Sequence, residues 1–90
     1  MDDVEEYMRM LHANKQICVL SYRHRLGRIT KDKLDFYADA LMEHEIVRKY
    51  WARFGGLRAD EASGDGRAEE FTAALEKAAQ FHIKHQTAAA

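Results

Sequence analysis

Proline is missing from this 90-residue sequence, and its absence constrains the fold more than any other feature. Proline interrupts helices most strongly, whereas alanine, glutamate, lysine, leucine and arginine, which favour helices, recur throughout the chain. Glycine is left as the main helix breaker, at positions 27, 55, 56, 64 and 66. No stretch alternates apolar and polar residues as strands do. The sequence therefore predicts an all-α fold whose helices end at the glycines.

The length allows one domain, which we expect to span residues 1–86, followed by a disordered tail at 87–90. A core of this size supplies only about 3–5 kcal/mol of net stability. The single cysteine cannot form a disulfide within the chain, so nothing covalent supplements that core. A second copy or another protein is therefore an expected source of stability.

Charge and hydropathy argue against two classes of protein. No apolar run approaches the roughly 18 residues of a membrane span, and the acidic start "MDDVEEY" is unlike a signal peptide, so we expect a cytoplasmic protein without a membrane segment. Fourteen basic and fifteen acidic residues give a net charge of −1, which provides no overall attraction to nucleic acid.

The first predicted helix, about 3–26, has apolar residues around more than half of its surface. One row repeats at helical spacing: Val4, Tyr7, Met8, Leu11, Cys18 and Tyr22. Met10, Ala13, Ile17 and Leu20 widen it. Such a helix is expected at the centre of the fold or buried in a dimer. Asn14 lies within this arc, so its amide is expected to have polar partners that set the packing register, or to contact a ligand. Cys18, between two apolar residues, is expected to be a buried, unreactive thiol.

Further along the chain, "LGRIT" predicts that one helix stops and another starts. Gly27 suits the left-handed conformation after a helix, and Thr30 can cap the next helix. Ile29 and Leu34 have the spacing of a hydrophobic staple, so the first two helices are predicted to form an αα-hairpin. The apolar phase changes after Met42, which predicts a break near 43–45. A short third helix is then predicted to end at the glycines 55–56, with a glycine-rich loop over 55–67 and a last helix over about 67–84, which completes a small four-helix bundle.

Tyr50 and Trp51 belong to an apolar group that also contains Val47 and Phe54. These residues stand at i, i+3, i+4 and i+7, so they share one helix face, and core packing is the simplest role for that face. Tyrosine and tryptophan also dominate protein interfaces, which makes an exposed anchor for a partner the alternative.

Candidate catalytic and metal-binding residues do not form a recognisable site in the sequence. His82 and His85 could provide two zinc ligands, but a site needs three or four. His44 could act as a base, but no nucleophile accompanies it. The glycine-rich stretch matches no phosphate-binding motif. We therefore expect no metal, no cofactor and no catalytic residue.

A basic patch surrounds the first turn and is followed at once by acidic residues. It consists of Arg23, Arg25, Arg28, Lys31 and Lys33. The acidic positions 32, 35 and 39 would repel phosphate, so nucleic acid explains the patch poorly. An anionic protein partner, or the acidic N-terminus of a second subunit in an antiparallel dimer, explains it better.

Several short motifs together resemble a known family. They are Asn14, "LGRITKDKL" at 26–34 and "VRKYWARF" at 47–54, of which Arg48, Tyr50 and Trp51 are the most distinctive. The chain resembles, over about residues 7–80, an uncharacterised actinobacterial family in which such a helical domain often follows a membrane-spanning segment. The resemblance implies a helical domain with Tyr50 and Trp51 as its signature, and it implies no activity. This sequence lacks the membrane segment, so anchoring is not implied for it.

The sequence thus favours a non-enzymatic protein–protein interaction module, accessory or regulatory, that acts as a homodimer or in a complex. A small-molecule-binding or enzymatic helical pocket is the alternative, and nucleic-acid binding through residues 23–33 is a third. The candidate interface or pocket residues are Asn14, Tyr22, Tyr37, His44, Tyr50 and Trp51.

Overall fold

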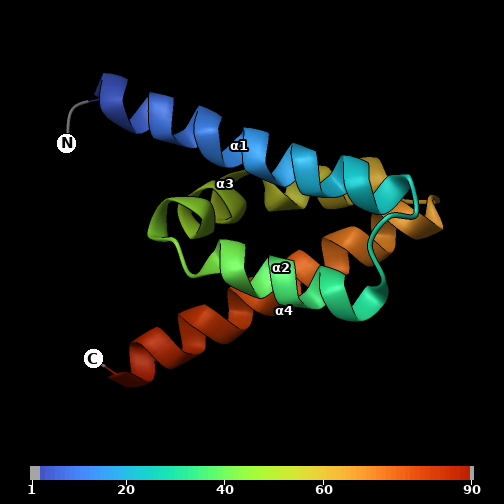
Figure 1. Ribbon diagram of the computed structural model, residues 1–90. Helices are drawn as coiled ribbons and strands as arrows, with labels where there is room; N and C mark the ends of the chain where they lie inside the picture. Colours follow the sequence, from blue (N-terminus) through green and yellow to red (C-terminus); the bar gives the residue numbers. More distant parts are fainter. Residues whose placement is uncertain (1–2, 90) are drawn as a thin grey trace.

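The computed structural model describes residues 3–89, with side chains up to His85, as four helices (Figure 1). They are α1 (Asp3–Arg25), α2 (Lys31–Met42), α3 (Glu45–Ala62) and α4 (Gly66–Ala89). The described residues contain no strand, which confirms the predicted all-α four-helix bundle. The predicted division into a domain of residues 1–86 and a disordered tail of residues 87–90 stays a prediction, and residue 90 lies outside the described part.

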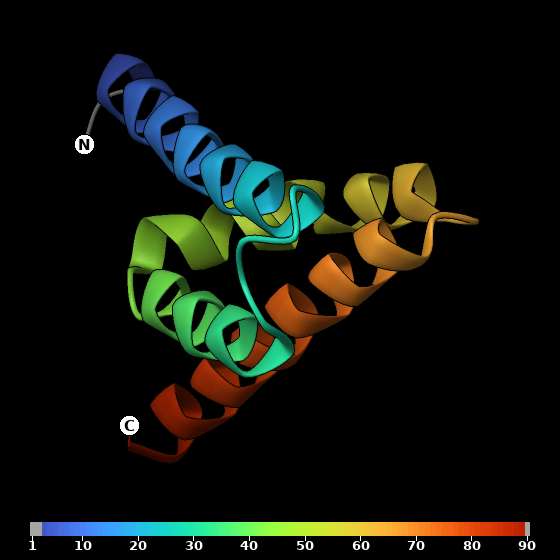
Figure 2. The same cartoon turned by 45° about the vertical axis from the view of Figure 1, so that its right-hand side comes forward.

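Helix α4 is the element that holds the others together. It crosses beneath α2 and α3 and contacts all three other helices, α2 most extensively (Figures 1 and 2). Helix α1 rests chiefly on α3 and makes fewer contacts with α4 and α2. It therefore lies at one side of the bundle, with much of its surface facing outward.

The turn between α1 and α2 has the predicted conformation. Gly27 has a φ of 73°, and its N–H donates to the His24 carbonyl at 3.0 Å. Thr30 caps α2, because its hydroxyl oxygen accepts from the Lys33 N–H at 3.3 Å. Arg67 of α4 donates to the carbonyls of His24 and Arg25, so a side chain distant in sequence helps to cap the end of α1.

The Thr30 cap gives a first testable prediction. Thr30→Ala is expected to lower the free energy of unfolding by about 1 kcal/mol, because the alanine cannot accept from the Lys33 N–H. Thr30→Ser keeps the acceptor and is expected to stay close to wild type. Chemical denaturation followed by far-UV circular dichroism measures both. Equal losses in the two variants would show that the cap contributes nothing.

The predicted break near 43–45 is present. α2 ends at Met42, and His44 is the N-cap residue of α3, with extended backbone dihedrals. The Arg48 guanidinium donates to the carbonyls of Met42 (2.6 Å) and Glu43 (2.9 Å). Two carbonyl groups at the C-terminal end of α2, which have no partner within the helix, thus receive hydrogen bonds.

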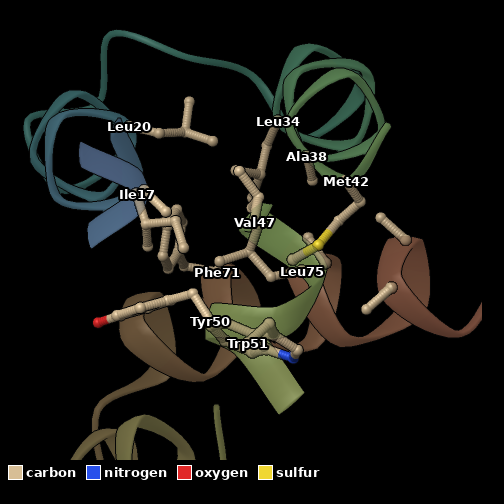
Figure 3. Close-up of a cluster of buried hydrophobic side chains, with 14 of the residues drawn as sticks. Ile17, Leu20, Leu34, Ala38, Met42, Val47, Tyr50, Trp51, Phe71 and Leu75 are labelled. Atoms are coloured by element: carbon tan, nitrogen blue, oxygen red, sulfur yellow. The ribbon is translucent and has the colours of Figure 1, made fainter. Parts of the chain in front are cut away.

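One core joins all four helices (Figure 3). Ile17, Leu34, Met42, Val47 and Leu75 are its largest fully buried side chains. Trp51 is only 4% exposed, and Tyr50 is also buried. The face shared by Val47, Tyr50 and Trp51 is thus a core face, as the helical spacing predicted.

The predicted end of the third helix at the glycines is wrong. α3 continues through Gly55 and Gly56 to Ala62, so the connection to α4 is only residues 63–65, not the predicted loop over 55–67. The reason lies in the packing of Trp51. A Cβ atom at position 55 would lie 2.8 Å from Trp51 Cε2, so the missing side chain makes room for the indole ring inside a continuous helix.

Candidate functional site: the outer face of α1 and the Asn14 cluster

Helix α1 has apolar residues on two opposite faces, and only one of them packs on the bundle. Ala13, Ile17, Leu20 and His24 are buried against the other helices. Val4, Tyr7, Met8, Leu11 and Tyr22, from the row predicted to face the core or a dimer partner, are all exposed. The expectation that α1 is central within the chain is therefore wrong, and its alternative, burial in a dimer, stays a prediction.

The exposed residues form a regular line, which we call the α1 seam. It consists of Val4, Met8, Leu11, Lys15, Cys18 and Tyr22. Their steps alternate between four and three residues, the spacing by which two helices pack along each other in a coiled coil. Val4 is 71% exposed and Tyr22 is 64% exposed, so both ends of the seam are open to solvent.

Asn14, at the edge of the seam, lies in a polar cluster with α3. The Tyr50 hydroxyl donates to Asn14 Oδ1 at 2.5 Å, and Arg58 Nη2 donates to the same oxygen at 2.6 Å. Arg58 also donates from Nε to the Tyr50 hydroxyl oxygen at 3.2 Å and from Nη2 to Cys18 Sγ at 3.3 Å. The prediction that the Asn14 amide has polar partners is confirmed. The expectation of a buried Cys18 is wrong, because this thiol is exposed beside Arg58.

Arg58 is the member of the cluster that sequence reasoning missed, because its position was assigned to a loop. Its spacing from Tyr50 and Phe54, at i+8 and i+4, is the signal that places it on their face once α3 continues through the glycines. Burial lowers the pKa of Arg58 and hydrogen bonds with Cys18 and Tyr50 raise it by more, so the pKa lies above its ordinary value. The guanidinium therefore carries a full positive charge.

A groove of about 510 Å³ separates the first half of α1 from α3 beside this cluster. Its walls combine apolar side chains with acidic residues near the start of α1 and one arginine of α3. They are Asp3, Glu6, Tyr7, Met10, Leu11, Asn14, Tyr50, Arg53 and Phe54. Tyr7 and Leu11 also belong to the exposed side of α1, so the groove opens toward that face.

The other predicted interface or pocket residues do not join Asn14 and Tyr50. Trp51 is in the core, where its Nε1 donates to Glu76 at 2.6 Å. Tyr37 and His44 line a separate shallow hollow of about 230 Å³ between α1 and α2. Tyr22 is exposed on α1, one turn from Cys18. The predicted set is thus divided among the core and three surface regions.

The basic patch is spread over the turn and is partly neutralised. Lys31 forms an ion pair with Asp35 at 2.8 Å, and Arg23 lies over the Tyr37 ring at 5.9 Å. Arg25, by contrast, borders a hollow that also contains Arg58.

The buried or half-buried histidines have structural partners. His24 is hydrogen-bonded to Glu70 and His82 to Asp39, each at 2.8 Å, which connects α4 to α1 and to α2. Within residues 3–89, no group of three or more potential metal ligands comes together. This part of the chain therefore offers no site that combines His, Cys, Asp and Glu around a metal.

Four helices around one core, with an apolar line of α1 left uncovered, define a small all-α domain. The chain belongs to a family of unknown function, DUF6082, whose model matches residues 2–89. This membership supports the predicted resemblance to an uncharacterised helical family. Searches of curated proteins and of solved structures found no match. None of the described helices has the length and hydropathy to cross a membrane.

Proposed function

We propose that the protein is a non-enzymatic interaction module that forms a homodimer through the α1 seam. The observation that carries this proposal is the exposed apolar line on a helix whose opposite face is already buried in the core. Lys15 is the one charged residue in the seam. Monomeric proteins seldom expose large apolar patches, and such patches are typical of interaction sites. A second copy of α1 carries the same spacing of four and three residues, so it is the occupant that we propose for the seam.

The seam spacing and helix length suit pairing of two α1 helices side by side. α1 has 23 residues, so it is about 34 Å long. In an antiparallel pair, Val4 faces Tyr22 of the other copy, and Met8 faces Cys18. Lys15 faces Leu11, and its long alkyl chain can pack on the leucine while the ammonium group reaches water.

The charges at the two ends of α1 favour the antiparallel orientation. The first turn carries Asp3, Glu5 and Glu6, and the last turn carries the exposed Arg23 and Arg25, whereas His24 is buried beside Glu70. An antiparallel second helix brings each acidic end beside a basic end, whereas a parallel one brings like charges together. Such complementarity sets orientation and discourages wrong partners.

Substitution of Tyr22 tests the proposal. Tyr22→Glu places a carboxylate in the apolar seam and is expected to weaken the dimer at least about tenfold, or ~1.4 kcal/mol. Light scattering after size exclusion, over a dilution series, measures the molar mass. Wild type is expected to approach twice the 10.4 kDa of one chain, and Tyr22→Glu to dissociate at concentrations where wild type does not.

Phe36→Glu is the matched control. Phe36 is 69% exposed on α2, away from the seam, so the same kind of change at similar exposure is expected to leave the dimer intact. A wild-type monomer at every concentration would refute the homodimer. Equal dissociation by both substitutions would show that the seam is not the interface.

A further inference from the structure

Beside the α1 seam lies a small hollow with two arginines. Its volume is about 220 Å³, and its lining is Cys18, Ser21, Tyr22, Arg25 and Arg58. We call it the arginine hollow. No carboxylate lines it. It therefore concentrates positive charge and hydrogen-bond donors at one point on a surface whose overall charge is close to neutral.

The positive charge of the hollow is not neutralised within the described residues. Among the described residues, the cationic members of the ion pairs are Lys31, Lys49, His24 and His82. Neither Arg25 nor Arg58 takes part in one. Every hydrogen-bond partner of the Arg58 side chain is a neutral group: Asn14, Tyr50 and Cys18. A half-buried guanidinium held by neutral partners keeps its charge available to an anion.

The same partners also fix the direction of Arg58. Bonds to Asn14 Oδ1 (2.6 Å) and to the Tyr50 hydroxyl (3.2 Å) hold the guanidinium on α3 against α1. An arginine that is oriented in advance loses less side-chain entropy when it binds, and its Nη1, which takes part in none of these bonds, is left to donate to an oxygen of a carboxylate or phosphate.

We infer that the arginine hollow binds an oxyanion, a phosphate or carboxylate group, through Arg25, Arg58 and the Ser21 hydroxyl. Charge-assisted bonds from two guanidinium groups are the strongest hydrogen bonds available for such a ligand. Glu61 lines an adjoining hollow that shares Ser21, Arg25 and Arg58, so its negative charge opposes binding of an anion. Glu61→Gln is accordingly expected to tighten binding.

The oxyanion could come from a free ligand or from the acidic first turn of a second copy. The inference does not depend on the proposed dimer, because the hollow is formed within one chain. A variant that separates the two sources is Met8→Lys, which disrupts the seam without touching the hollow.

Cys18 provides a direct measurement, because it is the only cysteine in the chain and lines the hollow. The probe is inorganic phosphate, and the readout is the rate at which a neutral alkylating reagent modifies Cys18. If the bound form is unreactive, mass action lowers the rate about tenfold when phosphate is at ten times its dissociation constant. Sodium chloride at equal ionic strength corrects for screening.

Two arginine substitutions make the test specific. Arg25→Gln removes a ligand while leaving the Asn14 cluster intact, and it is expected to abolish the protection. Arg28→Gln removes one charge from the neighbouring turn, outside the hollow, and is expected to preserve it.

Protection in both wild type and Met8→Lys would support a site for a free anion. Protection in Met8→Lys alone, with a wild-type thiol that is already slow to react, would also support the site, and it would indicate that the second copy covers Cys18 and the hollow in the wild type. If the wild type is a monomer, wild type and Met8→Lys are expected to give the same protection, and its presence or absence still tests the site. No protection in either protein, or equal protection in Arg25→Gln, would overturn the inference.

Discussion

Gly55→Ala is expected to destabilise the protein by about 2 kcal/mol, although alanine is normally the better residue inside a helix. The added methyl group would lie 2.8–2.9 Å from three atoms of the Trp51 indole. The ring cannot move aside easily, because it is 4% exposed and its Nε1 is bonded to Glu76. Overpacking of a core typically costs about 1–3 kcal/mol, and three contacts this short place Gly55→Ala near the upper end of that range. Subtracting the roughly 1 kcal/mol that alanine gains in helix propensity leaves a net loss of about 2 kcal/mol.

Gly56→Ala is the matched control at the next position. Nothing lies within 4 Å of a Cβ atom built there, so the substitution is expected to stabilise the protein by up to about 1 kcal/mol. Thermal unfolding is expected to give midpoints on opposite sides of wild type, with a fall of about 10 °C for Gly55→Ala in a domain of this size. Stabilisation of both variants would show that Gly55 does not make room for Trp51.

The features predicted correctly from sequence are those fixed by a few neighbouring residues. Gly27 marks a true helix end because the backbone there requires a positive φ. Thr30 caps α2 through a bond to a residue three positions away. The phase change after Met42 predicts the break before α3 because periodicity records which side of a helix is buried.

The errors arise where the meaning of a residue depends on distant contacts. The same residue type, glycine, ends a helix at position 27 and lies inside one at position 55, where only the packed indole explains it. The wide apolar arc of α1 could not show which side faces the core, because the choice depends on how α3 and α4 pack against it. The omission of Arg58 follows from the wrong helix end. A loop over 55–67 has no helical periodicity, so the spacing of Arg58 from Tyr50 carries no information until α3 is known to continue.

Removal of the Asn14 amide is expected to have a comparably large effect. Asn14→Leu is expected to lower the free energy of unfolding by about 2–3 kcal/mol, the cost of leaving hydrogen-bonding groups of a charged side chain unpaired. Asn14 Oδ1 accepts from both the Tyr50 hydroxyl and Arg58, so the substitution removes the acceptor of two donors at once. Both bonds are part-buried, so water in the adjoining groove can replace only part of the lost acceptor.

Gln16→Leu is the control, since it replaces another partly buried amide of α1 that lies outside the cluster. It is expected to change stability by less than about 0.5 kcal/mol. Urea unfolding at one fixed chain concentration keeps any dimer contribution comparable among the variants. Equal effects of Asn14→Leu and Gln16→Leu would show that the cluster contributes no stability.

The double variant Asn14→Leu/Arg58→Met separates a lost interaction from an unpaired charge. When both partners become apolar, no guanidinium is left without its acceptor, so the double variant is expected to cost at least about 1 kcal/mol less than the sum of the two single substitutions. Strict additivity would instead mean that Asn14 and Arg58 act independently. In that case Asn14 would not be what holds Arg58 in place, and the orientation of the guanidinium in the arginine hollow would depend on Tyr50 and Cys18.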